Sequence, residues 1–140
     1  MSPFSHFLHD LRMRHEIRQS DLAELLGYEQ SYISALEIGV KGPPTSEFVE
    51  KLVTVLALTP LERAEARQIM EASQRKFVLD SDSPQDLFWM FKELREQMNA
   101  LRPVQIKMIR DVLGMTGSLA EPEPEPVRRL RRRRKEEARM

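Results

Sequence analysis

A chain of 140 residues has room for one compact domain and a short appendage, and a hydrophobic content of 41% is enough for a buried core. Cysteine is absent, which excludes disulfide bonds and thiolate metal sites. No apolar run approaches the length of a membrane span, and no signal-peptide pattern opens the chain. We therefore expect a protein of the bacterial or phage cytoplasm, with no membrane partner.

The formal net charge of zero conceals an uneven distribution of charge. Residues 1–118 hold 14 of the 22 Lys and Arg residues but 17 of the 22 Asp and Glu residues, so a slightly acidic body precedes a basic C-terminal segment. Attraction to phosphate supplies much of the affinity of most DNA-binding proteins. A body with this charge would need locally placed donors, dimerisation or the basic segment to hold a nucleic acid.

The chain opens with a typical helix start, because Ser2 can cap a helix and Pro3 suits its first turn. Apolar residues then recur at helical spacing and predict one buried face. These residues are Phe4, Phe7, Leu8 and Leu11. Ile17, in the following loop, is expected to fill the core.

Two short helices are predicted next, over residues 19–26 and 30–37. Gly27 ends the first of them, at a position where a left-handed residue is favoured. The buried positions are Leu22, Ala23 and Leu26 in the first helix and Ile33 and Leu36 in the second. The solvent face of the second helix then consists of short side chains, namely Gln30, Ser31, Ser34 and Ala35. Short amide and hydroxyl side chains on a helix suit the base edges of a DNA major groove.

Two further helices complete this part of the chain. Gly39 and the Gly-Pro-Pro sequence at 42–44 mark the exit from the preceding helix, and Thr45 can cap the next one. The inward residues of that helix are predicted to be Phe48, Leu52, Val55 and Leu56. Thr59 to Glu62 is a capping box with a proline at the first helical position, and it begins a helix over 60–75. The pattern therefore predicts five helices around one core.

A polar linker precedes a second helical region. A helix over 84–101 carries apolar residues that alternate by four and three, as in the seam of a coiled coil. Those residues are Leu87, Phe91, Leu94, Met98 and Leu101. A further helix starts at Pro103 and carries Val104, Met108, Ile109, Val112 and Met115 on one side. Two helices cannot cover so much apolar surface alone, so we expect them to pack on the first domain or on a second subunit.

The last segment of the chain differs in composition from the rest. Residues 121–126 alternate Glu and Pro, which predicts an extended spacer, and the Arg-rich run at 127–135 is too charged to fold alone. Three roles stay open for this predicted disordered tail: a non-specific DNA clamp, a contact to RNA or to another protein, or a solubilising end. The acidic spacer would shield the basic run until DNA competes for it.

The stretch from Gln19 to Gly39 resembles the helix-turn-helix domain of the Cro and phage-repressor type, and the resemblance extends over residues 3–76. The residues that keep the spacing of that family are Gln19, Leu22, Ala23, Leu26, Gly27, Ile33, Ser34, Leu36, Glu37 and Gly39. Arg18 departs from it, because the family usually has a Ser or Thr helix cap there. The resemblance implies an all-α, five-helix domain that binds double-stranded operator DNA.

The site residues follow from this resemblance and from side-chain chemistry. The candidate base contacts are Gln30, Ser31, Tyr32, Ser34 and Ala35. The candidate phosphate contacts are Gln19, Arg18 and Lys41. The resemblance also implies a partly buried ion pair between Arg12 and Glu37, to which we assign a structural role.

We divide the chain into a DNA-binding domain at residues 1–77, a linker at 78–83, a helical hairpin at 84–117 and a spacer with a basic tail at 118–140. The hairpin is the expected dimerisation element of a homodimer, since helix-turn-helix proteins usually pair to read two half-sites. Its predicted interface residues are Leu87, Phe88, Trp89, Phe91, Leu94, Met98, Leu101, Met108 and Val112.

The expected function is that of a dimeric, nucleoid-associated transcriptional repressor that places helix 30–37 in the major groove. Two alternatives stay open: the antitoxin of a toxin–antitoxin pair, and an interaction adaptor that has lost DNA binding. His6, His9 and Asp10 lie on one turn but do not predict a metal site, because a third firm ligand is missing. No phosphate-binding loop or catalytic triad is present, so we expect neither a cofactor nor an enzyme.

Overall fold

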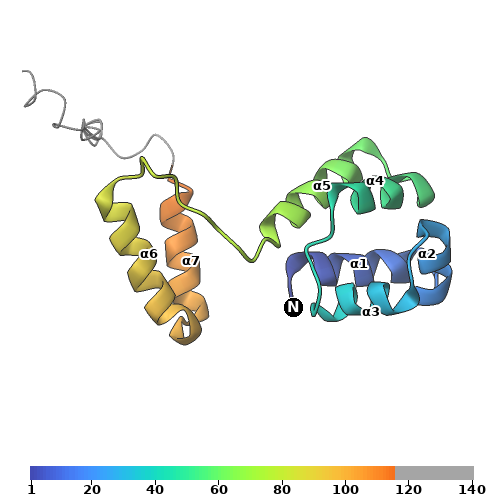
Figure 1. Ribbon diagram of the computed structural model, residues 1–140, viewed down its shortest axis with the longest axis horizontal. Coiled ribbons are helices and arrows are strands. Elements are labelled where there is room, and N and C mark those ends of the chain that lie inside the picture. Colours follow the sequence, from blue (N-terminus) through green and yellow to red (C-terminus); the bar gives the residue numbers. More distant parts are fainter. Residues whose placement is uncertain (116–140) are drawn as a thin grey trace, which may run out of the picture. The chain divides into compact units, whose positions relative to one another are not determined.

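The computed structural model describes residues 1–115, and every regular element within that range is a helix (Figure 1). This confirms the prediction of an all-α fold class. The Glu-Pro spacer and the Arg-rich run lie outside the described residues. The chain divides after Phe77 into two units, which are described separately below. No helix within residues 1–115 has the length and apolar character required to cross a lipid bilayer.

The first unit contains five helices: α1 (Pro3–Arg14), α2 (Gln19–Leu26), α3 (Gln30–Ile38), α4 (Ser46–Val55) and α5 (Pro60–Ala72). Three of them begin at the predicted caps. The hydroxyl of Ser2 accepts a hydrogen bond from the Ser5 N–H at 3.2 Å, and the hydroxyl of Thr45 accepts one from the Phe48 N–H at 3.3 Å. Thr59 forms the predicted capping box at the start of α5. Each cap satisfies backbone donors that a helix leaves unpaired at its N-terminus.

Helix α5 ends earlier than predicted, at Ala72 rather than at residue 75. The reason is a tertiary contact of Ser73, which is 4% exposed. Its hydroxyl donates to the Ile69 carbonyl at 2.7 Å and accepts from the Phe4 N–H at 2.9 Å. A residue that follows α5 in sequence therefore satisfies a backbone donor in the first turn of α1. The Arg75 guanidinium then donates to the carbonyl of Gly39, which lies at the end of α3.

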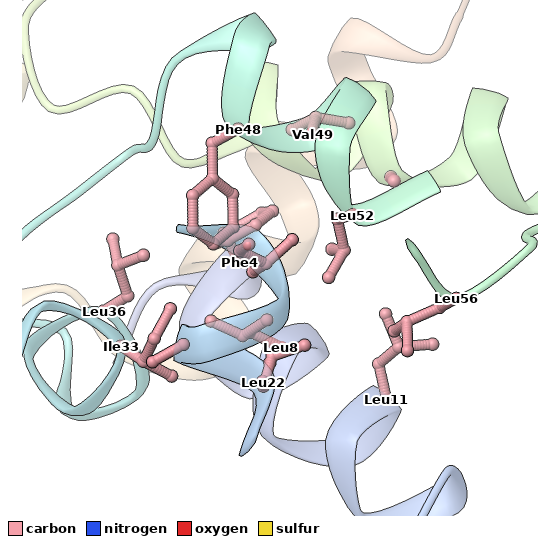
Figure 2. Packing of buried hydrophobic residues seen from close by; sticks show 13 residues of the cluster. Phe4, Leu8, Leu11, Leu22, Ile33, Leu36, Phe48, Val49, Leu52 and Leu56 are labelled. Carbon is pink, nitrogen blue, oxygen red and sulfur yellow. The ribbon is translucent and has the colours of Figure 1, made fainter. Parts of the chain in front are cut away.

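The core of the first unit lies between the helices and draws on all five of them (Figure 2). Its buried hydrophobic residues are Phe4, Leu8, Leu11, Leu22, Ala23, Leu26, Ile33, Leu36, Phe48, Val49, Leu52, Leu56 and Ala66. Burial of a large apolar side chain contributes about 1.5–3 kcal/mol to folding. Within α4 the structure corrects one predicted position, because Val49 is fully buried whereas Val55 is only partly so. Ile17 packs against this core, as predicted.

Gly27 and Gly39 end α2 and α3 with φ angles of 78° and 89°, a conformation that side chains with a Cβ atom disfavour. A Cβ atom at Gly27 would meet no heavy atom within 4 Å, whereas one at Gly39 would lie 3.2 Å from the hydroxyl oxygen of Ser5. We expect Gly27→Ala to lower the free energy of unfolding by about 1–2 kcal/mol through backbone strain alone. Gly39→Ala should cost more. Urea denaturation of both variants measures the difference, and equal losses would contradict it.

The second unit contains α6 (Gln85–Gln97), the short 3₁₀ helix η1 (Met98–Ala100) and α7 (Pro103–Leu113). The helix predicted over about 84–101 starts close to the expected position, with Pro84 as the N-cap of α6, but α6 ends at Gln97 and the last turn tightens into η1. α6 and α7 form a hairpin (Figure 1). None of their residues is buried. The exposed large apolar side chains are Phe88, Trp89, Met90, Met98, Val104, Ile106, Met108, Ile109, Val112 and Leu113.

Candidate nucleic-acid interface

Helices α2 and α3 are held at a fixed angle by their buried faces and by the turn at Gly27. The N–H of Tyr28 donates to the carbonyl of Ala23 at 2.9 Å, which closes the end of α2. Ala23 is 2% exposed, and its small side chain lets α3 approach closely. Because Ile33 and Leu36 are buried, the opposite face of α3 is directed to solvent.

The structure places the candidate base contacts on this outer face with different exposures. Gln30 and Ser31 are exposed at the first turn of α3, whereas Ser34 and Ala35 are half-buried. The Ser31 hydroxyl donates to the carboxylate of Glu29 at 3.4 Å. The first turn of α3 therefore offers the most accessible amide and hydroxyl groups of the predicted set.

Tyr32 lies on the same helix, but its ring packs inward. The ring centroid is 5.2 Å from that of Tyr28 and 5.9 Å from that of Phe48. Burial, together with the neighbouring Tyr28, raises the pKa of the Tyr32 hydroxyl above its ordinary value of 10.0. Tyr32 therefore remains neutral at physiological pH, where its hydroxyl both donates and accepts hydrogen bonds.

Two lysines flank this pair of tyrosines. The Nζ atom of Lys41 lies 5.9 Å from the ring centroid of Tyr32, and that of Lys51 lies 4.9 Å from the ring centroid of Tyr28. Sequence reasoning named Lys41 but missed Lys51, because Lys51 belongs to α4 and reaches the turn only through the tertiary fold. Arg18, the other predicted cation, is exposed directly before α2 and makes no capping hydrogen bond through its side chain.

A buried carboxylate joins the first three helices. Glu37 of α3 has a side chain that is 5% exposed, and its Oε1 atom accepts a hydrogen bond from the Nε of Arg12 at 2.6 Å. Its Oε2 atom accepts from the Nη2 of Arg12 at 3.2 Å and from the Nε2 of Gln19 at 2.6 Å. Arg12 also donates to the carbonyl of Ile17 at 3.0 Å. Sequence reasoning named all three side chains but did not place Gln19 on Glu37.

The pKa of Glu37 reflects this environment. Burial alone would raise the pKa, but the hydrogen bonds from Arg12 and Gln19, with the charge of Arg12 and a weaker bond from His9, hold it below its ordinary value of 4.5. The unfolded chain keeps the ordinary value. The carboxylate therefore contributes its full stability above about pH 4.5, and this contribution is lost as the pH falls through the lower folded pKa.

We expect the free energy of unfolding to decrease on acidification below about pH 4.5, with a smaller decrease in Glu37→Gln, which has no carboxylate to protonate at this position. Urea denaturation at a series of pH values measures both slopes. The pKa values of Glu50 and Glu62 are also lowered, by hydrogen bonds from Arg67 and Arg63 and from Thr59 respectively, so part of the slope remains in the variant. Identical slopes in the two proteins would contradict the assignment to Glu37.

Comparison with known protein families supports the interpretation of α2 and α3 as a helix-turn-helix. Residues 3–66 match a family model described as a helix-turn-helix domain. A chain from the solved SinR protein/SinI protein complex is 22% identical with a TM-score of 0.40, and the match covers 79% of this chain and 94% of that one. At this TM-score the likeness carries no weight for function. No curated protein matched the chain. The part of the chain that contains α1 to α4 is therefore similar to a helix-turn-helix domain.

Proposed function

We propose that the protein is a sequence-specific, DNA-binding transcriptional regulator that acts in the cytoplasm as a dimeric repressor. The observation that carries the proposal is the outer face of α3, where exposed amide and hydroxyl groups stand opposite a fully buried stripe. A helix supported in this way enters the major groove with its N-terminal residues against the base edges. Repression follows from occlusion, because a dimer on a promoter blocks access to it.

Base reading is assigned to the short side chains of α3. Gln30 pairs bidentately with adenine, Ser31 and Ser34 hydrogen-bond either type of base, and the Ala35 methyl contacts the methyl group of thymine. Tyr32 contributes its hydroxyl from a ring that is anchored in the core.

Phosphate contacts are assigned to Gln19 and to the cations around α2 and α3, with Lys51 added to the residues expected from sequence. Lys41 and Lys51 are held beside the tyrosine rings, and Arg18 precedes α2. Each neutralised phosphate adds about 0.9 to the slope of the logarithm of affinity against the logarithm of salt concentration. A small set of cations per subunit is consistent with a body that has no excess of positive charge.

The dimer is assigned to the hairpin. Its large apolar side chains are exposed on both helices, and Trp89 is 60% exposed. A stable interface of standard size buries about 800 Å² per partner. Pairing of two hairpins covers this surface and places two α3 helices on half-sites about one helical turn of DNA apart.

Selection of duplexes from a randomised pool by the full chain tests the proposal. We expect enrichment of a sequence with two-fold symmetry. Gln30→Ala should weaken discrimination at one position of each half-site by about 1–3 kcal/mol. Gln68→Ala, which changes an exposed glutamine on α5, is the matched control and should leave the selected sequence unchanged. Failure of the pool to enrich any sequence would refute the proposal.

The exposed hairpin also favours a second function, in which its apolar surface binds a different protein. The chain would then be the antitoxin of a toxin–antitoxin pair, or an adaptor without DNA binding. Co-purification with a small basic protein supports the antitoxin. An adaptor is supported if Gln30→Ala combined with Ser31→Ala leaves promoter output in cells unchanged.

A further inference from the structure

The buried carboxylate of Glu37 binds a third side chain, Gln19, in addition to its ion-pair partner Arg12. Its carboxylate accepts hydrogen bonds from Arg12 of α1 and from Gln19, the first residue of α2, while Glu37 itself belongs to α3. Arg12 is fixed in turn by the carbonyl of Ile17. The hydrogen bonds from Arg12 therefore fix the position of the Glu37 carboxylate. This fixed carboxylate in turn holds the side-chain amide of Gln19.

The side-chain amide of Gln19 is only partly used by this network. Its nitrogen, Nε2, carries two hydrogens and donates one of them to the Oε2 atom of Glu37, with a nitrogen–oxygen distance of 2.6 Å. Among residues 1–115 the second N–H of that amide has no protein partner. Gln19 is half-exposed at the N-terminus of α2, so part of its side chain is open to solvent.

We propose that Glu37 is a positioning residue for DNA binding: it holds the Gln19 amide in the orientation from which the second N–H donates to a phosphate of the DNA backbone. This inference rests on the proposed function, since it names one of its phosphate contacts. A bond to an ionised acceptor is about twice as strong as a neutral one, so the carboxylate fixes the amide before DNA arrives.

The expected gain comes from entropy already lost in the free protein. A flexible glutamine loses rotamer freedom when it binds a phosphate, and immobilising one such side chain weakens binding by a factor of about 3–10. When Glu37 is present, the Gln19 side chain loses most of this rotamer freedom during folding rather than on DNA binding. The contact is neutral, so it releases no counterion and leaves the salt slope unchanged.

The test measures the effect of Gln19→Ala in two backgrounds of the full chain, with a duplex from the selection described above as the probe. In the native background we expect Gln19→Ala to weaken binding about 3–10-fold. In the background Arg12→Met Glu37→Leu, which removes both buried charges and the acceptor, Gln19→Ala should change affinity by less than about 2-fold. The salt slope should be the same with and without Gln19→Ala.

Several outcomes would overturn the inference. Equal effects of Gln19→Ala in both backgrounds would show that Glu37 does not act through Gln19, and no effect in the native background would show that Gln19 does not contact DNA. If the double background fails to fold by circular dichroism, Glu37→Gln replaces it with the same expectation of a reduced effect. A native protein that selects no duplex refutes the proposed function, whereas selective binding with equal effects refutes only this inference.

Discussion

Replacing Arg12 by alanine is expected to lower the free energy of unfolding by about 3–5 kcal/mol, the cost of leaving a buried charge without its partner. The Arg12 side chain is 13% exposed and that of Glu37 is 5% exposed, so water cannot replace the guanidinium beside the carboxylate. The variant also removes the donor to the Ile17 carbonyl. Urea denaturation measures the loss, with far-UV circular dichroism reporting helix content.

Two controls separate the charge from the packing. Arg14→Ala removes an exposed arginine from the same helix and should change stability by less than about 0.5 kcal/mol. Arg12→Met Glu37→Leu removes both charges and keeps apolar volume, so it should recover most of the loss, because apolar replacements of buried pairs are often neutral. If the double variant is as unstable as Arg12→Ala, packing rather than charge explains the effect.

The helix starts and buried faces of residues 1–77 could be predicted because they depend on neighbours in sequence. The capping box of α5 needs only Thr59 and Glu62, and the stripe of α1 follows from helical periodicity. The end of α5 could not be predicted in this way. It is set by the contact of Ser73 with Phe4, which are 69 residues apart, and no local pattern contains that information.

The same distinction applies to the candidate interface. The outer face of α3 follows from the buried positions of Ile33 and Leu36, so sequence reasoning could name its residues. The link between Gln19 and Glu37 joins residues on different helices, and the approach of Lys51 to Tyr28 requires α4 to pack beside the turn. Contacts of this kind arise only when the core is assembled.

For the hairpin, periodicity predicts which side of each helix is apolar but not what covers it. Leu94, for example, is only half-buried by its own hairpin, and it lines an apolar groove of about 390 Å³ between α6 and α7. Phe91 and Leu101 line the same groove. An apolar groove on a hairpin without a buried residue is a surface that a second subunit would cover.

We expect Leu94→Glu to convert the proposed dimer into a monomer, because a carboxylate in this groove is costly to desolvate when a second hairpin packs over it. Loss of the second half-site should weaken binding to the selected duplex by a factor of about 100 or more, since linked binding of two sites raises affinity by about 10²–10⁴. Sedimentation equilibrium measures the mass, and fluorescence anisotropy measures the affinity.

Arg95→Glu is the matched control, because it places the same side chain at the next, exposed position of α6 and should leave both mass and affinity unchanged. Trp89 is the only tryptophan of the chain, so its emission reports the hairpin alone. Burial of Trp89 in the dimer should shift its emission to shorter wavelength in the native protein, and Leu94→Glu should reverse that shift. A Leu94→Glu protein that remains dimeric would exclude this groove as the subunit interface, and a monomeric native protein would refute the dimer itself.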